Sequence, residues 1–186
     1  MSKDAIVIID MLNDFADPKG ALYCPAGRTI IPKLQELIAF AHDNGIQVIF
    51  IQEAHRQNDK DFRVRPIHAI KGTWGSDFID ELRPDLKKGD YVVQKRRHSA
   101  FAYTDMDLFL REEGIDTIVV TGTWTNVCVR STASDALYHT YSVVAISDCC
   151  ASKTEEMHEH GLVDIGIFGK VMTLAEYKAS KTNKAA

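Results

Sequence analysis

The stretch "TIVVTGTWTNVCVRS", residues 117–131, joins an apolar run to a segment with a helical pattern. Its first part, residues 117–122, is rich in Val and lacks a regular alternation with polar residues, which is typical of a strand covered on both faces. Cys128 stands where the apolar run gives way to the helical pattern. The rest of the chain repeats this arrangement of a buried strand followed by a helix.

Apolar runs of this kind recur along the chain, with helix-length segments between them. We expect strands at residues 5–10, 46–52, 91–95, 117–122, 141–147 and 170–174. We expect helices near residues 29–44, 76–83, 105–114, 126–139 and 154–168. Such alternation predicts an α/β fold in which a parallel sheet carries helices on both faces.

Length and composition bound the size of the protein. The 186 residues are 45% hydrophobic and 26% charged, which fits one globular domain with a core of its own. No internal repeat, low-complexity segment or linker divides the sequence. We therefore expect a single domain over residues 1–186, with a polar tail at 176–186 that frays.

Charge and hydropathy exclude several classes of partner. The net charge of −4 leaves no basic footprint for nucleic acid and no polybasic patch for a membrane surface. No apolar run approaches the ~20 residues of a membrane span, and the first ten residues lack a secretion-signal pattern. The four cysteines form no CxxC pair and no disulfide scaffold. We expect a reduced, cytoplasmic protein.

Polar side chains end several predicted strands, at the edge of the sheet where doubly wound folds bind ligands. Asp10 follows "AIVII", Lys95 ends "YVVQK", and Cys128 follows the strand at 117–122. Taken singly, each has an ordinary explanation: an ion pair, a snorkelling surface lysine and a buried packing thiol. Together they supply a nucleophile, a base for its proton and a cation that holds the base ionised.

The position of Cys128 near a helix N-terminus bears on its reactivity. The partial positive charge and free N–H groups of such a terminus predict a lowered thiol pKa and donors for an oxyanion. His98 is a rival base, because Cys–His pairs are common in nucleophilic catalysis. It lies three residues past the strand at 91–95, where it could equally line the pocket or face solvent.

Five segments of the chain resemble the isochorismatase-like cysteine hydrolases, which include nicotinamidases and N-carbamoylsarcosine amidases. The segments are "VIIDMLNDF" (7–15), "KGTWGSDF" (71–78), "QKRRHSAF" (94–101), "VTGTWTNVCVRSTASDA" (120–136) and "ISDCCAS" (146–152). They occur in the family's order and span nearly the whole chain. The resemblance implies a three-layer α/β/α sandwich around a six-stranded parallel sheet with a Rossmann-like strand order.

The resemblance also implies roles for individual residues. Asp10, Lys95 and Cys128 would form a catalytic triad, and the Thr123–Trp124 peptide would be cis. The backbone N–H groups of Trp124 and Cys128 would form the oxyanion hole. The expected reaction is acyl transfer from a small amide through a thioester on the cysteine, and this chemistry requires no cofactor.

A departure from the family pattern bears on the substrate. Nicotinamidases resemble one another in a Trp three residues before a metal-binding His, where this chain has Arg65. A guanidinium suits a carboxylate, so we expect a small amide or N-carbamoyl compound that bears one, with Phe15 and Trp124 as apolar walls. Nicotinamide is the alternative substrate. The alternative for Arg65 is an outward ion pair with Asp59 or Asp61.

The long stretch between residues 53 and 90 has no clear regular element and is typical of a binding loop. The resemblance places Glu53, His55 and His68 where nicotinamidases bind metal. Two His and a carboxylate suit zinc, iron or manganese, although Glu stands where those enzymes have Asp. The alternative is that the three side chains organise the loop without a metal, as the resemblance to N-carbamoylsarcosine amidases implies.

Other functions stay open at this point. One is vinyl-ether hydrolysis of the isochorismatase type, which needs no cysteine in that branch. Another is a catalytically silent protein that binds a metabolite or a partner. The presence of Cys128 with both of its partners counts against each. The family further implies a homodimer or homotetramer, and Cys24, Cys149 and Cys150 have no assigned role.

Overall fold

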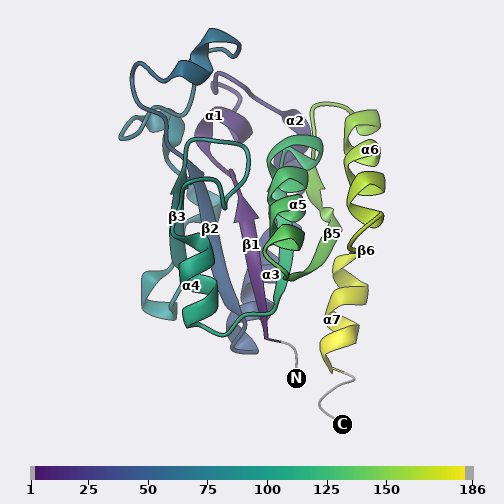
Figure 1. Cartoon of the computed structure of the whole chain (residues 1–186). Coiled ribbons are helices and arrows are strands. Elements are labelled where there is room, and N and C mark those ends of the chain that lie inside the picture. Colours follow the sequence, from purple (N-terminus) through teal and green to yellow (C-terminus); the bar gives the residue numbers. More distant parts are fainter. Residues whose placement is uncertain (1–2, 183–186) are drawn as a thin grey trace.

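The computed structural model describes residues 3–182, in which six strands form one parallel sheet (Figure 1). The strands are β1 (Asp4–Ile9), β2 (Gln47–Glu53), β3 (Tyr91–Lys95), β4 (Thr117–Thr123), β5 (Ser142–Ala151) and β6 (Lys170–Met172). They lie in the order β3-β2-β1-β4-β5-β6, and every neighbouring pair is parallel. The predicted Rossmann-like sheet is confirmed.

Helices cover both faces of this sheet (Figure 1). One face carries α3 (Ile31–Asp43) and α7 (Leu174–Thr182). The other carries α4 (Met106–Glu112), α5 (Arg130–Tyr138) and α6 (Glu155–Gly166). Two short helices, α1 (Asn13–Ala16) and α2 (Pro25–Thr29), follow β1. The three-layer sandwich is therefore confirmed. Within residues 3–182, no helix is both long and apolar enough to cross a bilayer.

Strand β1 shows why the predicted strands lack polar alternation. All six of its residues are buried. Ile6 and Ile8 pack into the cluster beneath α3, whereas Val7 and Ile9 pack into the cluster beneath α4, α5 and α6. A strand with helices on both sides carries apolar side chains on both faces, as Ala5–Ile9 do, because neither face meets water.

The helix predicted at residues 76–83 is wrong. The segment forms two 3₁₀ turns, Trp74–Ser76 and Asp80–Leu82, with extended backbone between them. Its backbone bonds with the chain that follows β1: Asn13 N donates to Asp77 O at 2.9 Å, and Ile79 N donates to Met11 O at 3.2 Å. Hydrogen bonds to a distant segment thus replace the local bonds that a helix would make.

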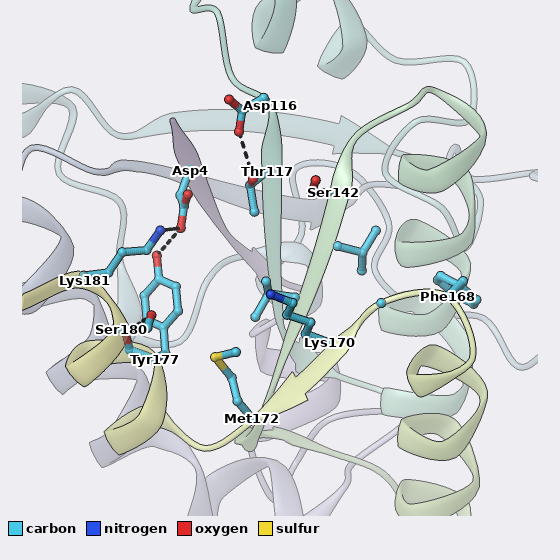
Figure 2. A pocket seen from close by; sticks show the side chains of 13 residues that line it. Asp4, Asp116, Thr117, Ser142, Phe168, Lys170, Met172, Tyr177, Ser180 and Lys181 are labelled. Carbon is cyan, nitrogen blue, oxygen red and sulfur yellow. Dashed lines mark hydrogen bonds and ion pairs between the residues drawn. The ribbon is translucent and has the colours of Figure 1, made fainter. Parts of the chain in front are cut away.

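The fraying tail predicted from residue 176 is also wrong as far as Thr182, where α7 ends. The buried Tyr177 hydroxyl donates to Asp4 Oδ2 at 2.8 Å, and Lys181 pairs with the same oxygen. Figure 2 shows these side chains beside a cavity of about 950 Å³ at the amino ends of the strands. Packing against the sheet therefore holds α7 in place. Residues 183–186, the rest of the predicted tail, lie outside the described residues.

A glycine brings β1 and β4 close together where β1 ends. Gly122 has φ +98°, and a Cβ there would lie 2.2 Å from Ile9 O, the carbonyl just before Asp10. Gly114 has φ +63°, and a Cβ there would meet no atom of the described structure within 4 Å. The first glycine is required by conformation and by space, the second by conformation alone.

We expect Gly122→Ala to lower the free energy of unfolding by on the order of 3–5 kcal/mol, because a backbone clash adds to the left-handed conformation. Gly114→Ala, the matched control, should cost about 1–2 kcal/mol through conformation alone. Denaturant titration of both variants measures the difference. Equal losses would show that the contact with Ile9 carries no cost.

Candidate active site

Three strand ends bring Asp10, Lys95 and Cys128 together at the carboxyl edge of the sheet. Asp10 directly follows β1, Lys95 ends β3, and Cys128 lies in a π-helical turn, Thr125–Val129, between β4 and α5. Lys95 Nζ lies 2.7 Å from Asp10 Oδ2 and donates to Cys128 Sγ at 3.6 Å. All three are buried, with exposed fractions of 1%, 1% and 4% in chain order. The structure thus brings together the three side chains selected from the sequence.

The backbone of Asp10 is held in an unusual conformation. Its φ is +51°, the left-handed region that costs a non-glycine residue roughly 1–2 kcal/mol. Asp10 N donates to Ile51 O at 3.1 Å, and Asp10 O accepts from Thr123 Oγ1 at 3.1 Å. The carboxylate itself accepts from Glu53 N at 3.1 Å. Bonds to both neighbouring strands therefore fix the direction in which this side chain points.

Burial controls the charges in this cluster. Burial raises the pKa of Asp10 to about 6, against the opposing effect of the Lys95 charge. Burial also raises the pKa of the Cys128 thiol well above its ordinary value; Lys95 opposes this rise and Asp10 adds to it. Burial alone would lower the pKa of Lys95, but the charges of Asp10 and Cys128 raise it. At neutral pH the cluster therefore holds an ammonium, a mostly ionised carboxyl and a neutral thiol.

This result corrects the prediction of a lowered thiol pKa at Cys128. The sulfur is enclosed by protein, and the loss of water outweighs the helix terminus and the nearby lysine. The rival base His98 is exposed, whereas Cys128 contacts Lys95 and Asp10. Among the candidate bases, Asp10 is the one in contact with the sulfur.

The loop before Cys128 adopts the predicted backbone turn. The Thr123–Trp124 peptide bond is cis. Trp124 O accepts from Val127 N at 3.0 Å and from Val129 N at 3.2 Å, which closes the turn around the cysteine. The Trp124 ring packs edge-on against Phe15, with centroids 5.9 Å apart. The structure thus brings together the two rings that were expected from the sequence to wall the substrate.

Contacts from α6 and from the residue after β5 hold this loop, and they were not identified from the sequence. Thr125 Oγ1 and His158 Nδ1 are hydrogen-bonded at 2.8 Å, and Ser152 Oγ donates to Asn126 Oδ1 at 2.7 Å. A Cβ on Gly161 would lie 2.8 Å from Asn126 N. A lone glycine within a helical pattern is the signal that could have indicated such close packing.

A second buried cluster lies next to the first. Glu53 ends β2, His55 follows two residues later, and His68 comes from the long loop. Their candidate ligand atoms all lie within 4.8 Å of one another. His55 Nε2 is 3.0 Å from Glu53 Oε1, and His68 Nε2 is 3.4 Å from Glu53 Oε2. The three predicted metal-binding side chains thus converge.

Two atoms of this cluster show that its donor set fits a divalent metal. Among the described residues, Glu53 Oε2 and His68 Nε2 are buried without a hydrogen-bond partner. His68 Nδ1 donates to Pro66 O at 2.6 Å, which leaves Nε2 as the ring nitrogen that faces the carboxylate. A ring nitrogen and a carboxylate oxygen that face each other in this way suit a shared cation.

Asp59 contacts the side of the His55 ring that faces away from Glu53, and it was not selected from the sequence as a site residue. Its buried carboxylate lies 3.4 Å from His55 Nδ1 and 3.3 Å from guanidinium nitrogens of both Arg96 and Arg97. Burial alone would raise the pKa of Asp59, but hydrogen bonds from Asp61 N and His55 hold it well below its ordinary range. A carboxylate behind a histidine fixes the ring and its tautomer.

Arg65 turns toward the second cluster. Its Nη1 lies 3.3 Å from Glu53 Oε1 and 3.1 Å from Asp61 Oδ2. The expected alternative of an outward ion pair is thus only partly right, because Asp61 is a partner but Glu53 lies inside the protein. Burial alone would lower the pKa of Arg65, but the charges of Glu53 and Cys128 raise it. The guanidinium therefore adds a positive charge to the buried cluster around Glu53.

Comparison with known proteins places the chain among hydrolases. The isochorismatase domain family matches residues 4–176. The chain is 32% identical over 184 residues to a protein of Arabidopsis thaliana described as a probable inactive nicotinamidase, with 93% of each covered. It is 32% identical over 192 residues to the ureidoacrylate amidohydrolase of Acinetobacter baylyi, with 88% of this chain and 77% of the relative covered.

Solved structures are similar over nearly the whole chain. An isochorismatase-like hydrolase from Alkaliphilus metalliredigens has a TM-score of 0.92 at 60% identity, covering 96% of this chain and 99% of the other. N-carbamoylsarcosine amidase from Thermoplasma acidophilum has a TM-score of 0.83 at 33% identity, covering 92% and 96%. Pyrazinamidase of Pyrococcus horikoshii in complex with zinc has a TM-score of 0.83 at 31% identity, covering 92% and 99%.

We expect Lys95→Met to lower the free energy of unfolding by about 3–5 kcal/mol, because it leaves the buried Asp10 carboxylate without its counter-charge. Lys88→Met, at an exposed lysine, should change it by no more than about 0.5 kcal/mol. Chemical unfolding at pH 8, where Asp10 is ionised, measures both. A loss for Lys95→Met as small as the control's would mean that other groups balance Asp10.

Proposed function

The chain belongs to the isochorismatase-like cysteine hydrolase superfamily, and on that premise we propose that it cleaves the C–N bond of a small amide or N-carbamoyl compound that bears a carboxylate. The observation that carries the proposal is the position of Lys95 Nζ, 2.7 Å from Asp10 Oδ2 and 3.6 Å from Cys128 Sγ. This contact joins a thiol to a carboxyl that can accept its proton. Amidohydrolases among the relatives support the same class of reaction.

In the first step Asp10 takes the thiol proton while Cys128 Sγ attacks the carbonyl carbon. The thiol pKa is raised well above its ordinary value and that of Asp10 is about 6, so this transfer is unfavourable in the free enzyme. It becomes favourable as the negative charge moves from sulfur to the substrate oxygen. The N–H groups of Trp124 and Cys128 are the proposed donors to that oxygen, a role typically worth ~3–4 kcal/mol for one donor.

The remaining steps use the same carboxyl as acid and then as base. Protonated Asp10 gives its proton to the leaving nitrogen. Ammonia or an amine then departs as the tetrahedral intermediate collapses to the thioester. Asp10 then accepts a proton from water as the water attacks the thioester carbon. The second tetrahedral intermediate then collapses, the acid leaves, and Asp10 returns its proton to the sulfur, which restores the thiol. Lys95 stays protonated throughout, since Asp10 and Cys128 raise its pKa, and it keeps Asp10 oriented.

Arg65 supports a carboxylate on the substrate. Its guanidinium lies beside Glu53, and a planar fork of donors can bind a carboxylate in a bidentate manner. Ureidoacrylate and N-carbamoylsarcosine, named for two similar proteins, are both carbamoyl compounds with an acid group. Phe15 and Trp124 would enclose the rest of a small substrate.

Nicotinamide hydrolysis is the second candidate. The paired rings of Phe15 and Trp124 suit a pyridine, and the Glu53, His55 and His68 cluster fits a divalent metal such as the zinc bound by the similar pyrazinamidase. These three side chains would hold the metal, which supplies a Lewis acid that polarises a substrate oxygen or nitrogen. Arg65 counts against this substrate, because it stands in place of an aromatic wall.

We expect Cys128→Ala to abolish ammonia release from every small amide that the wild type hydrolyses, because no other group can carry the acyl intermediate. Circular dichroism should show an intact fold. Cys149→Ala, which removes a buried thiol from the opposite face of the sheet, is the control and should retain turnover. Amidase activity that survives in Cys128→Ala would overturn the mechanism. Absence of activity in the wild type on all amides would favour a silent protein.

We expect Arg65→Ala to raise the KM for carbamoyl compounds bearing a carboxylate roughly tenfold to a hundredfold, the value of one charge-assisted hydrogen bond. The KM for nicotinamide should stay unchanged. Steady-state kinetics with and without chelator separate this effect from metal binding. If nicotinamide proves the better substrate and Arg65→Ala leaves every KM alone, the carboxylate assignment fails.

A further inference from the structure

One oxygen of Glu53 has two nitrogen neighbours from the protein itself, a histidine and a guanidinium. Oε1 lies 3.0 Å from His55 Nε2 and 3.3 Å from Arg65 Nη1. The carboxyl is fully buried, so water does little to screen these contacts. Oε2 of the same carboxyl lies 3.4 Å from His68 Nε2 and has no hydrogen-bond partner among the described residues. The carboxyl is therefore approached by a fixed cation on one side and by an unpartnered ring nitrogen on the other.

A guanidinium in this position opposes the binding of a divalent metal. It keeps its proton under all ordinary conditions, so its charge cannot be removed as a metal arrives. A metal bound by Glu53, His55 and His68 would share one carboxylate with Arg65, and two positive groups on one buried carboxylate repel each other. The guanidinium also donates a hydrogen bond to Oε1, and so uses a lone pair that a metal could otherwise bind.

The surroundings of Arg65 allow it to give way. Its side chain is 17% exposed, unlike the fully buried histidines, and Nη1 also lies 3.1 Å from Asp61 Oδ2. Asp61 belongs to the same loop and is itself 19% exposed. Arg65 can therefore keep one ion pair at the edge of the site while Glu53 turns to another cation.

We propose that Arg65 is an internal cation that competes with divalent metal for Glu53 and so sets the metal affinity of this cluster. The inference rests on the metal cluster of the proposed function and goes beyond it, because it concerns affinity rather than the reaction. In this chain the guanidinium supplies part of the charge balance that a metal would give. The metal consequently binds more weakly than the three ligands alone would hold it.

The test measures Zn²⁺ binding to purified, chelator-treated protein by isothermal titration calorimetry. We expect Arg65→Ala to bind Zn²⁺ about tenfold more tightly than the wild type, because the repulsion across Glu53 is gone. Arg63→Ala is the matched control: it removes the same charge from an exposed position on the same loop, and should leave the affinity unchanged. Adding Glu53→Gln to Arg65→Ala should abolish the gain, which locates the metal at this cluster.

The outcomes separate this inference from the proposed function. Equal or weaker Zn²⁺ binding in Arg65→Ala overturns the competition while leaving the metal cluster intact. A gain that persists with Glu53→Gln, or that Arg63→Ala matches, overturns it as well, because the effect would then arise away from Glu53. Failure of every variant to bind Zn²⁺ overturns both the metal cluster and the competition. None of these results bears on the amidase activity of Cys128.

Discussion

The ion pair between Lys95 and Asp10, buried at 2.7 Å, is the contact on which the site depends. Removing two charges from water is expensive, and an apolar pair of similar size would stabilise the fold as well or better. The sheet nevertheless builds this pair from two strands that are not neighbours. Lys95 ends β3 opposite Glu53 of β2, and its side chain crosses the end of β2 to reach Asp10. This arrangement gives the sulfur a cation and a base at once.

The two buried clusters form one electrostatic unit. Glu53 donates its backbone N–H to the Asp10 carboxylate, while its own carboxyl contacts His55, His68 and Arg65. Burial alone would raise the pKa of Glu53, but the Lys95 charge, the His55 hydrogen bond and the Arg65 charge hold it well below its ordinary range. A cation placed on Glu53 is therefore felt at Asp10. Under the two proposals above, the choice between guanidinium and metal in one cluster would therefore change the acid–base chemistry of the other.

Much of this site could be predicted from the sequence, and the failures have physical causes. The carboxyl ends of parallel strands meet at one edge, so Asp10, Lys95 and Cys128 had to lie near one another. The helix expected at residues 76–83 failed because hydrogen bonds to Met11 and Asn13 replace local ones. The prediction of a lowered thiol pKa at Cys128 was wrong because burial depends on packing, which a linear pattern does not reveal.

The side chains that support the two clusters could not be predicted from the sequence, for a related reason. Asp59 contacts His55, and His158 is hydrogen-bonded to Thr125 in the cysteine loop. Only the fold brings these distant residues together. Their residue types are common on solvated surfaces, so neither stands out in the chain. The order of the strands could be predicted, because the family resemblance implied it.

The enclosure of Cys128 has a consequence for the durability of the protein. Peroxides oxidise thiolates far faster than neutral thiols, and they must also reach the sulfur. A sulfur that is 4% exposed, with a raised pKa, meets neither condition in the resting state. If Cys128 ionises only in contact with a carbonyl group, as the proposed mechanism requires, the resting sulfur stays protected against oxidants. The burial that makes proton transfer costly would then also preserve the thiol between turnovers.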